Sequence, residues 1–156
     1  MKLFVFSLFY ICKKNVIRFK HNNFLTLAEA DLAQWLERIA ALEGYTVDEL
    51  EYNFVDSNTL FTINKEYLNH DTYTDIVTFD YTENKAIKAE AYISCDALKE
   101  NAKKYRQSTE SECLRLLSHG LLHCLGFNDK SIEEKVIMRS KEEDCINLFH
   151  VKHGYV

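Results

Sequence analysis

The segment LSHGLLHCLGFNDK, residues 117–130, constrains this chain more than any other stretch. On a helix, His119 and His123 lie one turn apart on the same face, so both imidazoles can reach a single cation. Gly126 follows the apolar run and is typical of the residue just past a helix C-terminus. The turn that this glycine allows can bring Asp129 back toward the two imidazoles as a third ligand.

Three such ligands are typical of a hydrolytic metal centre. Catalytic zinc has three protein ligands and one open position, whereas structural zinc is usually closed by four ligands rich in cysteine. A histidine pair at this spacing also arises by chance, but the glycine turn and the carboxylate favour a metal site. The sequence therefore predicts one Zn²⁺ per chain, bound by His119, His123 and Asp129 at the end of a buried helix.

The motif HGLLHCLGFND resembles the signature His-Gly-x-Leu-His-Leu-x-Gly-Tyr-Asp-His of a bacterial rRNA maturation factor family usually called YbeY. Members of this family are single-strand-specific, zinc-dependent endoribonucleases. Two upstream segments are similar to the family in the same order, INKEYLNHDTYTDIVTF at residues 63–79 and AEAYIS at residues 89–94. The resemblance covers roughly residues 50 to 145, most of the chain.

The resemblance implies a cytoplasmic, zinc-dependent endoribonuclease of late rRNA maturation, acting at the 3′ end of 16S rRNA and in ribosome quality control. Single-stranded RNA or rRNA and the small ribosomal subunit are the implied partners. The nucleophile would be a metal-bound water or the RNA's own 2′-hydroxyl, and the sequence favours neither. Asn64 and Asp75 are candidates to hold the site or to contact RNA, although capping of a helix and a strand explains them at least as well.

Three positions depart from the family pattern. Asp129 stands where most members have histidine, so the net charge of the site falls by one and a bound water should be less acidic. Leu68 replaces an arginine that is expected to contact a phosphate, and Arg106 or Arg115 would have to substitute for it. The third departure, Ala89-Glu90 in place of Gly-Asp, concerns only local geometry.

The net charge of −5 is unfavourable for an RNA-binding protein, because phosphate binding normally relies on a basic surface. A local basic patch would then be needed, and the cations before the motif helix are the candidates: Lys99, Lys103, Lys104 and Arg106. An ordinary solvated helix face explains these residues equally well. Tyr73 and Tyr105 are candidate surfaces for base stacking, although a core or chance surface position is the better explanation of each one singly.

Three other classes of protein fit parts of the pattern. A metallopeptidase needs a glutamate beside the first histidine of its His-Glu-x-x-His motif, and here that position is Gly120. A non-haem iron protein also uses two histidines and one carboxylate, but these usually come from strands. Nothing in the sequence excludes a third class, a non-catalytic ribosome-associated factor whose metal is structural. Loss of RNA cleavage in a folded His123→Ala variant would favour a nuclease over this third class.

The hydrophobic pattern predicts an α+β fold, a small mixed β-sheet packed against several helices. Strands are expected at 15–20, around 50–54, 75–81 and 87–94. Helices are expected at 26–44, 58–68, 96–105, from about 110 through the motif, and from 131 to about 149. Three capping boxes support these helix starts, namely Thr26 with Glu29, Thr109 with Glu112, and Ser131 with Glu134, and Asp96 is expected to cap the third helix.

Length and composition favour a single domain over residues 1–156, since 47% of the residues are hydrophobic and neither proline nor a linker-like stretch occurs. Residues 1–14 are expected to be an N-terminal extension of the domain or an additional first strand. Their apolar run is too short to span a bilayer and lacks the cleavage site of an export signal, so no membrane association is expected. The five cysteines form no CxxC pair and are expected to be reduced, with Cys124 packed in the core rather than bound to metal.

Overall fold

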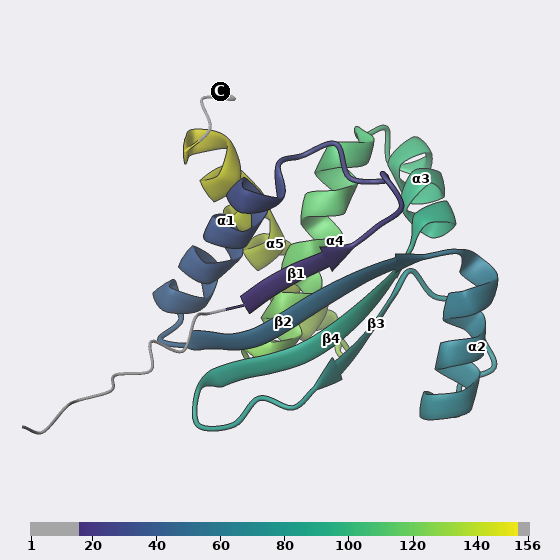
Figure 1. Ribbon diagram of the computed structural model, residues 1–156, viewed down its shortest axis with the longest axis horizontal. Coiled ribbons are helices and arrows are strands. Elements are labelled where there is room, and N and C mark those ends of the chain that lie inside the picture. Colours follow the sequence, from purple (N-terminus) through teal and green to yellow (C-terminus); the bar gives the residue numbers. More distant parts are fainter. Residues whose placement is uncertain (1–15, 153–156) are drawn as a thin grey trace, which may run out of the picture.

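The computed structural model describes residues 16–152, which form a four-stranded sheet and five helices (Figure 1). The elements in chain order are β1 (Val16–Lys20), α1 (Glu29–Leu42), β2 (Thr46–Val55), α2 (Ser57–Leu68), β3 (Ile76–Asp80), β4 (Ala86–Ser94), α3 (Cys95–Lys104), α4 (Thr109–Cys124) and α5 (Ile132–Lys152). The strand order is β1-β2-β4-β3. β2 runs parallel to β1 and β4, and β3 pairs antiparallel with β4. The predicted α+β fold with a mixed sheet is confirmed.

Strand β2 is longer than its hydrophobic alternation indicates. It begins at Thr46, four residues before the first residue of the predicted strand. The pairing with β4 shifts register between Val47 and Glu49, which inserts Asp48 as an extra residue. Because of this bulge, Val47 and Leu50 are both buried although they are three positions apart. A strict period of two therefore underestimates the length of this strand.

The motif helix α4 passes behind the sheet in Figure 1 and contacts both α5 and α1, and α1 also packs against β1 and β2. Tyr52 of β2 is fully buried, and its hydroxyl donates a hydrogen bond to the Leu117 carbonyl oxygen at 2.7 Å. Gly120 lets the helix approach the sheet closely, since a Cβ there would lie 3.1 Å from Ile76 Cδ1. Trp35 of α1 donates to the Cys145 carbonyl oxygen of α5 at 2.7 Å. The Tyr52 hydrogen bond and the close approach at Gly120 thus hold α4 against the sheet, and Trp35 joins α1 to α5.

Only one of the three predicted capping boxes is formed. The Glu134 amide donates to Ser131 Oγ at 3.1 Å, and the Ser131 amide donates to Glu134 Oε2 at 3.0 Å, so α5 begins as predicted. In contrast, α4 is capped by Ser108 and α3 by Ser94, each accepting from an amide three residues later. α1 has Ala28 at its N-cap and no side-chain cap.

The other predicted cap residues have tertiary partners instead. Thr26 Oγ1 donates to Glu110 Oε1 at 3.0 Å, and Asp96 Oδ2 accepts from the Ser57 amide at 3.0 Å. Glu112 is buried and accepts from Asn101 Nδ2 of α3 at 3.3 Å. Contacts between distant segments thus decide the role of these side chains more than local sequence does.

No helix within residues 16–152 is both long and apolar enough to cross a membrane. The apolar run at 3–12 and the expected N-terminal extension lie outside the described residues. The assignment of residues 1–156 to one domain stays a prediction.

Candidate metal centre

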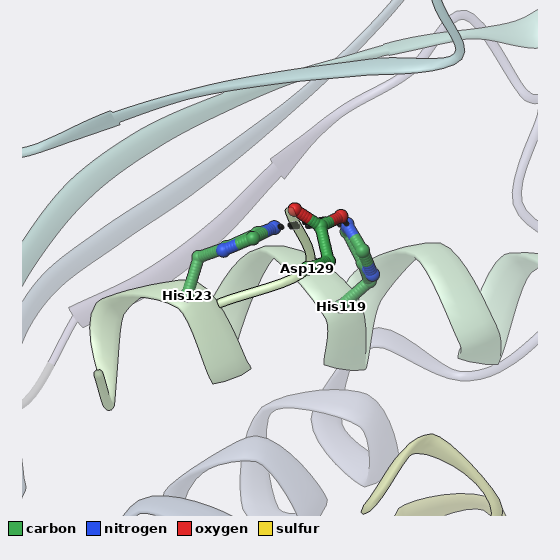
Figure 2. Close-up of side chains that lie close together, drawn as sticks. All are labelled: His119, His123 and Asp129. Atoms are coloured by element: carbon green, nitrogen blue, oxygen red, sulfur yellow. Dashed lines mark hydrogen bonds and ion pairs between the residues drawn. The ribbon is translucent and has the colours of Figure 1, made fainter. Parts of the chain in front are cut away.

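The three predicted ligands converge at the C-terminal end of α4 (Figure 2). His119 Nε2 and His123 Nε2 lie 3.0 Å apart. Asp129 Oδ2 is 3.4 Å from His119 Nε2 and 3.5 Å from His123 Nε2. The three atoms therefore form a nearly equilateral triangle, built by residues on one helix and the loop after it.

This triangle has the dimensions of a zinc site. Ligands about 2.0–2.1 Å from a tetrahedral ion are about 3.3–3.4 Å from one another, close to the three separations found here. His119 Nδ1 is 2.7 Å from a carboxylate oxygen of Glu142, and in the neutral tautomer that donates to this oxygen, Nε2 offers its lone pair to a cation in the triangle. A divalent cation fits the donor set of two imidazole nitrogens and one carboxylate oxygen.

The turn after α4 brings Asp129 to the two histidines. Gly126 has φ +93°, a left-handed conformation that favours glycine. The Phe127 amide donates to the Leu122 carbonyl oxygen at 3.0 Å, and the Gly126 amide donates to the His123 carbonyl oxygen at 3.0 Å. This pair of bonds is the Schellman arrangement that ends a helix and reverses the chain. The predicted glycine turn is confirmed.

Glu142 of α5 holds the imidazole of His119 in place. Its side chain is buried, with Oε1 at 2.7 Å from His119 Nδ1. Arg115 Nη1 lies 3.6 Å from the same oxygen, and Arg139 Nη1 lies 4.0 Å from Oε2. A carboxylate that accepts from the second ring nitrogen of a ligating histidine fixes the tautomer and raises the basicity of the ligand.

Arg115 lies among three carboxylates. Its guanidinium donates to Glu112 Oε1 at 2.6 Å and to Asp75 Oδ2 at 3.3 Å, in addition to its contact with Glu142. Burial alone would lower the pKa of Arg115, but the hydrogen bonds and charge of Glu112, with the charges of Glu142 and Asp75, raise it above its ordinary value. This cation therefore balances charges of the protein itself and is poorly placed to take over a phosphate contact from position 68.

The two other predicted site residues are not members of the triangle. Asn64 is buried near the end of α2, and its amide nitrogen donates to the Thr72 carbonyl oxygen at 2.9 Å. Asp75 accepts from Asn101 Nδ2 at 3.2 Å and from Arg115. Asn64 thus closes the loop that follows α2, and Asp75 joins the carboxylate network beside the motif helix. Their catalytic roles stay predictions.

The two candidate stacking residues lie on the surface. Tyr73 is 67% exposed, and its ring stacks on Phe61 of α2 with 4.5 Å between the ring centroids. Tyr105, just after α3, is 52% exposed and lies beneath the ammonium group of Lys104. Neither tyrosine is a core residue, and base stacking on them stays a prediction.

Sequence reasoning missed Glu142, although a signal for it exists. The buried positions of α5 are Met138, Glu142, Cys145 and Phe149, which recur at helical spacing. A carboxylate within an otherwise apolar stripe indicates a buried charge that needs a partner. What the sequence does not show is that this partner is His119, 23 residues earlier.

A pocket of about 560 Å³ opens beside the triangle. His119 and Asp129 form part of its wall, and α5 supplies most of the rest. The lining residues from α5 are Ile132, Lys135, Val136, Met138, Arg139 and Glu142. The cations of the predicted basic patch, from Lys99 to Arg106, do not line this pocket.

Cys124 is buried and belongs to the hydrophobic core, as predicted. Burial, with a smaller contribution from Asp80, raises the pKa of its thiol to about 12. The thiol is therefore protonated at neutral pH. Its position beside His123 in the sequence does not place it among the grouped ligand atoms.

Comparison with known proteins gives a consistent result. The model of a family described as endoribonuclease YbeY matches residues 10–150 of this chain. A relative of that name from Christiangramia forsetii is 40% identical over 134 residues, which is 86% of this chain and 94% of the relative. Another, from Flavobacterium johnsoniae, is 42% identical over 124 residues, 80% of this chain and 89% of the relative.

A solved structure shares the fold. The solution structure of TM1509 from Thermotoga maritima matches with a TM-score of 0.64 at 22% sequence identity. The match covers 88% of this chain and 91% of that protein. At this identity the likeness concerns the arrangement of helices and strands alone.

Proposed function

This chain belongs to the endoribonuclease YbeY family, and we propose that it is a metal-dependent endoribonuclease that cuts single-stranded RNA. His119, His123 and Asp129 are the proposed ligands of one zinc ion. The observation that carries the proposal is the convergence of their three donor atoms, 3.0–3.5 Å apart, beside an open pocket.

The chain's own residues have distinct roles in this proposal. When bound, a divalent cation supplies Lewis-acid polarisation of a phosphodiester oxygen. His119 and His123 hold it through Nε2 on the rigid helix α4, and Glu142 keeps the imidazole of His119 oriented. Asp129, on the loop, contributes an anionic ligand whose side chain is 40% exposed, so the RNA backbone can approach from this side.

The proposed substrate is ribosomal RNA. Membership of an endoribonuclease family supports an RNA substrate, and the family resemblance suggests the 3′ end of 16S rRNA, with action in the cytoplasm on the small ribosomal subunit. A role in ribosome quality control is part of the same proposal. The reaction itself needs only a flexible single strand, because a phosphodiester in a rigid duplex is hard to bring into a pocket beside a helix end.

Peptide hydrolysis is a weaker alternative. The position after the first histidine is Gly120, and a Cβ there would lie 3.1 Å from Ile76 Cδ1 and 3.3 Å from Thr78 Oγ1. A glutamate side chain at this position would crowd Ile76 and Thr78 of β3, so a general base there fits poorly against the sheet. In RNA cleavage the attacking group can be the 2′-hydroxyl of the RNA, whose position differs from that of a peptidase's water, so its proton need not be taken by a base at position 120.

The proposal is tested with purified protein and a pair of labelled RNAs of the same sequence, one single-stranded and one annealed to its complement. Cleavage of the single strand is expected, at least about tenfold faster than cleavage of the duplex. Treatment with a chelator should abolish cleavage, and Zn²⁺ should restore it. Cleavage that survives complete metal removal would contradict the proposed function.

A further inference from the structure

We propose that Lys135 and Arg139, on α5, bind a phosphate of the RNA strand adjacent to the phosphate that is cut. The inference rests on the proposed function and names a second binding position for the same substrate. It assigns the phosphate contact that position 68, a leucine, does not supply.

The two cations lie beside the proposed metal ligands. Both line the pocket of about 560 Å³ whose wall also contains His119 and Asp129. They are four residues apart on α5, so their side chains leave the helix on the same face. A strand whose phosphodiester lies at the triangle therefore passes these two cations if it continues along α5.

The charges of Lys135 and Arg139 are only weakly neutralised by carboxylates within residues 16–152. Arg139 is 60% exposed, and its ion pair with Glu142 is long, at 4.0 Å. Glu142 has closer partners in His119 and Arg115. Within residues 16–152, Lys135 forms no ion pair at 4.0 Å or less, so its ammonium group can bind a ligand.

Three of the other cations considered for phosphate binding have partners within the protein. Arg115 is paired with three carboxylates. Lys99 and Lys104 lie over the rings of Phe24 and Tyr105, on the side of the molecule formed by α3. Lys135 and Arg139 share a pocket with proposed metal ligands, so they can act on the same strand.

The apolar side chains of the pocket favour binding of a nucleotide over binding of a small anion. Ile132 and Val136 come three residues before the two cations on α5 and are 78% and 64% exposed. Aliphatic side chains beside two cations offer contact to a sugar or base while the cations take the phosphate. The pocket thus has the composition that one nucleotide of a single strand needs.

The test uses the variants Lys135→Ala and Arg139→Ala, singly and together, with Lys152→Ala at the far end of α5 as the matched control. Binding of a fluorescent single-stranded RNA to the zinc-loaded protein is measured by anisotropy in the cold, before cleavage sets in. Zinc content and circular dichroism check the fold. The double variant is expected to bind about tenfold more weakly than the control. The slope of log K against log salt should fall by about 0.7, since the two cations together neutralise one phosphate.

A second readout separates this inference from the proposed function. A dinucleoside monophosphate contains only the phosphate that is cut, so it lacks the phosphate that the two cations are proposed to bind. The double variant should therefore lose kcat/KM on longer RNA by about tenfold more than on this dinucleotide. Unchanged binding and salt slope, or equal losses on both substrates, would overturn the inference. Failure of the wild type to cleave any RNA, with binding lost only in the double variant, would overturn the proposed function instead.

Discussion

The variant His123→Ala is expected to lose its bound zinc and to cut single-stranded RNA at least about a thousandfold more slowly than the wild type. His123 supplies one of only three donor atoms, and two remaining ligands hold a divalent cation weakly. Its side chain is 30% exposed at the end of α4, so removing it leaves the core intact. Cleavage rates, zinc content and circular dichroism, measured on the same preparation, check this result.

The matched control for this variant is His70→Ala. His70 is exposed after α2, and its backbone amide, not its imidazole, donates to the Asn64 carbonyl oxygen. This variant should keep full zinc and full activity. A His123→Ala protein that is folded and still cleaves RNA at the wild-type rate would show that the metal centre is not needed for cleavage.

Glu142→Ala is expected to lower both stability and zinc affinity. The substitution leaves His119 Nδ1 without its acceptor and takes one carboxylate from the partly buried Arg115. Removing one partner of a buried charge network costs about 3 kcal/mol in the free energy of unfolding. Loss of the carboxylate behind a histidine ligand weakens metal binding about 10- to 100-fold. Denaturant unfolding and a competition titration with a zinc indicator measure the two effects.

The variant Glu142→Gln tests whether the Glu142 side chain orients His119 through a hydrogen bond or only fills space in the core. The amide oxygen of glutamine can still accept from Nδ1, so we expect zinc affinity to recover to within about tenfold of the wild type. Glu143→Ala is the matched surface control, because this neighbouring carboxylate is exposed. If Glu142→Ala binds zinc as tightly as the wild type, Glu142 does not position the ligand.

The convergence of the three donor atoms could be predicted from sequence because it depends on local structure. His119 and His123 are one helical turn apart, and Gly126 ends that helix in a left-handed conformation. Asp129 follows three residues later, so a single helix end determines all three positions. No contact with a distant part of the chain is needed to bring them together.

The residues that surround the triangle depend on distant contacts and were not predictable in the same way. Glu142 reaches His119 because α5 packs along α4. Arg115 looks like a free cation in the sequence, yet the fold surrounds it with Glu112, Asp75 and Glu142. The local sequence pattern predicts on which face of a helix a residue lies. The residue that it contacts is decided by how the helices pack, which the local pattern does not show.

The helix N-termini also include one case that follows local sequence and one that depends on distant contacts. Ser131 and Glu134 form their capping box as the local pattern predicts. Thr26 fits the same pattern but hydrogen-bonds to Glu110, 84 residues away, and α1 begins without a side-chain cap. Such competition from tertiary contacts outweighs a cap that contributes only about 1 kcal/mol.

The most direct test of the metal centre is the zinc content of the purified protein after reconstitution, determined by mass spectrometry for the wild type and for Asp129→Ala. We expect about one zinc per chain in the wild type and a loss of most of it in the variant, because Asp129 is the third ligand. A wild type that takes up no zinc, or an Asp129→Ala protein that keeps a full equivalent, would contradict the proposed His119, His123 and Asp129 site.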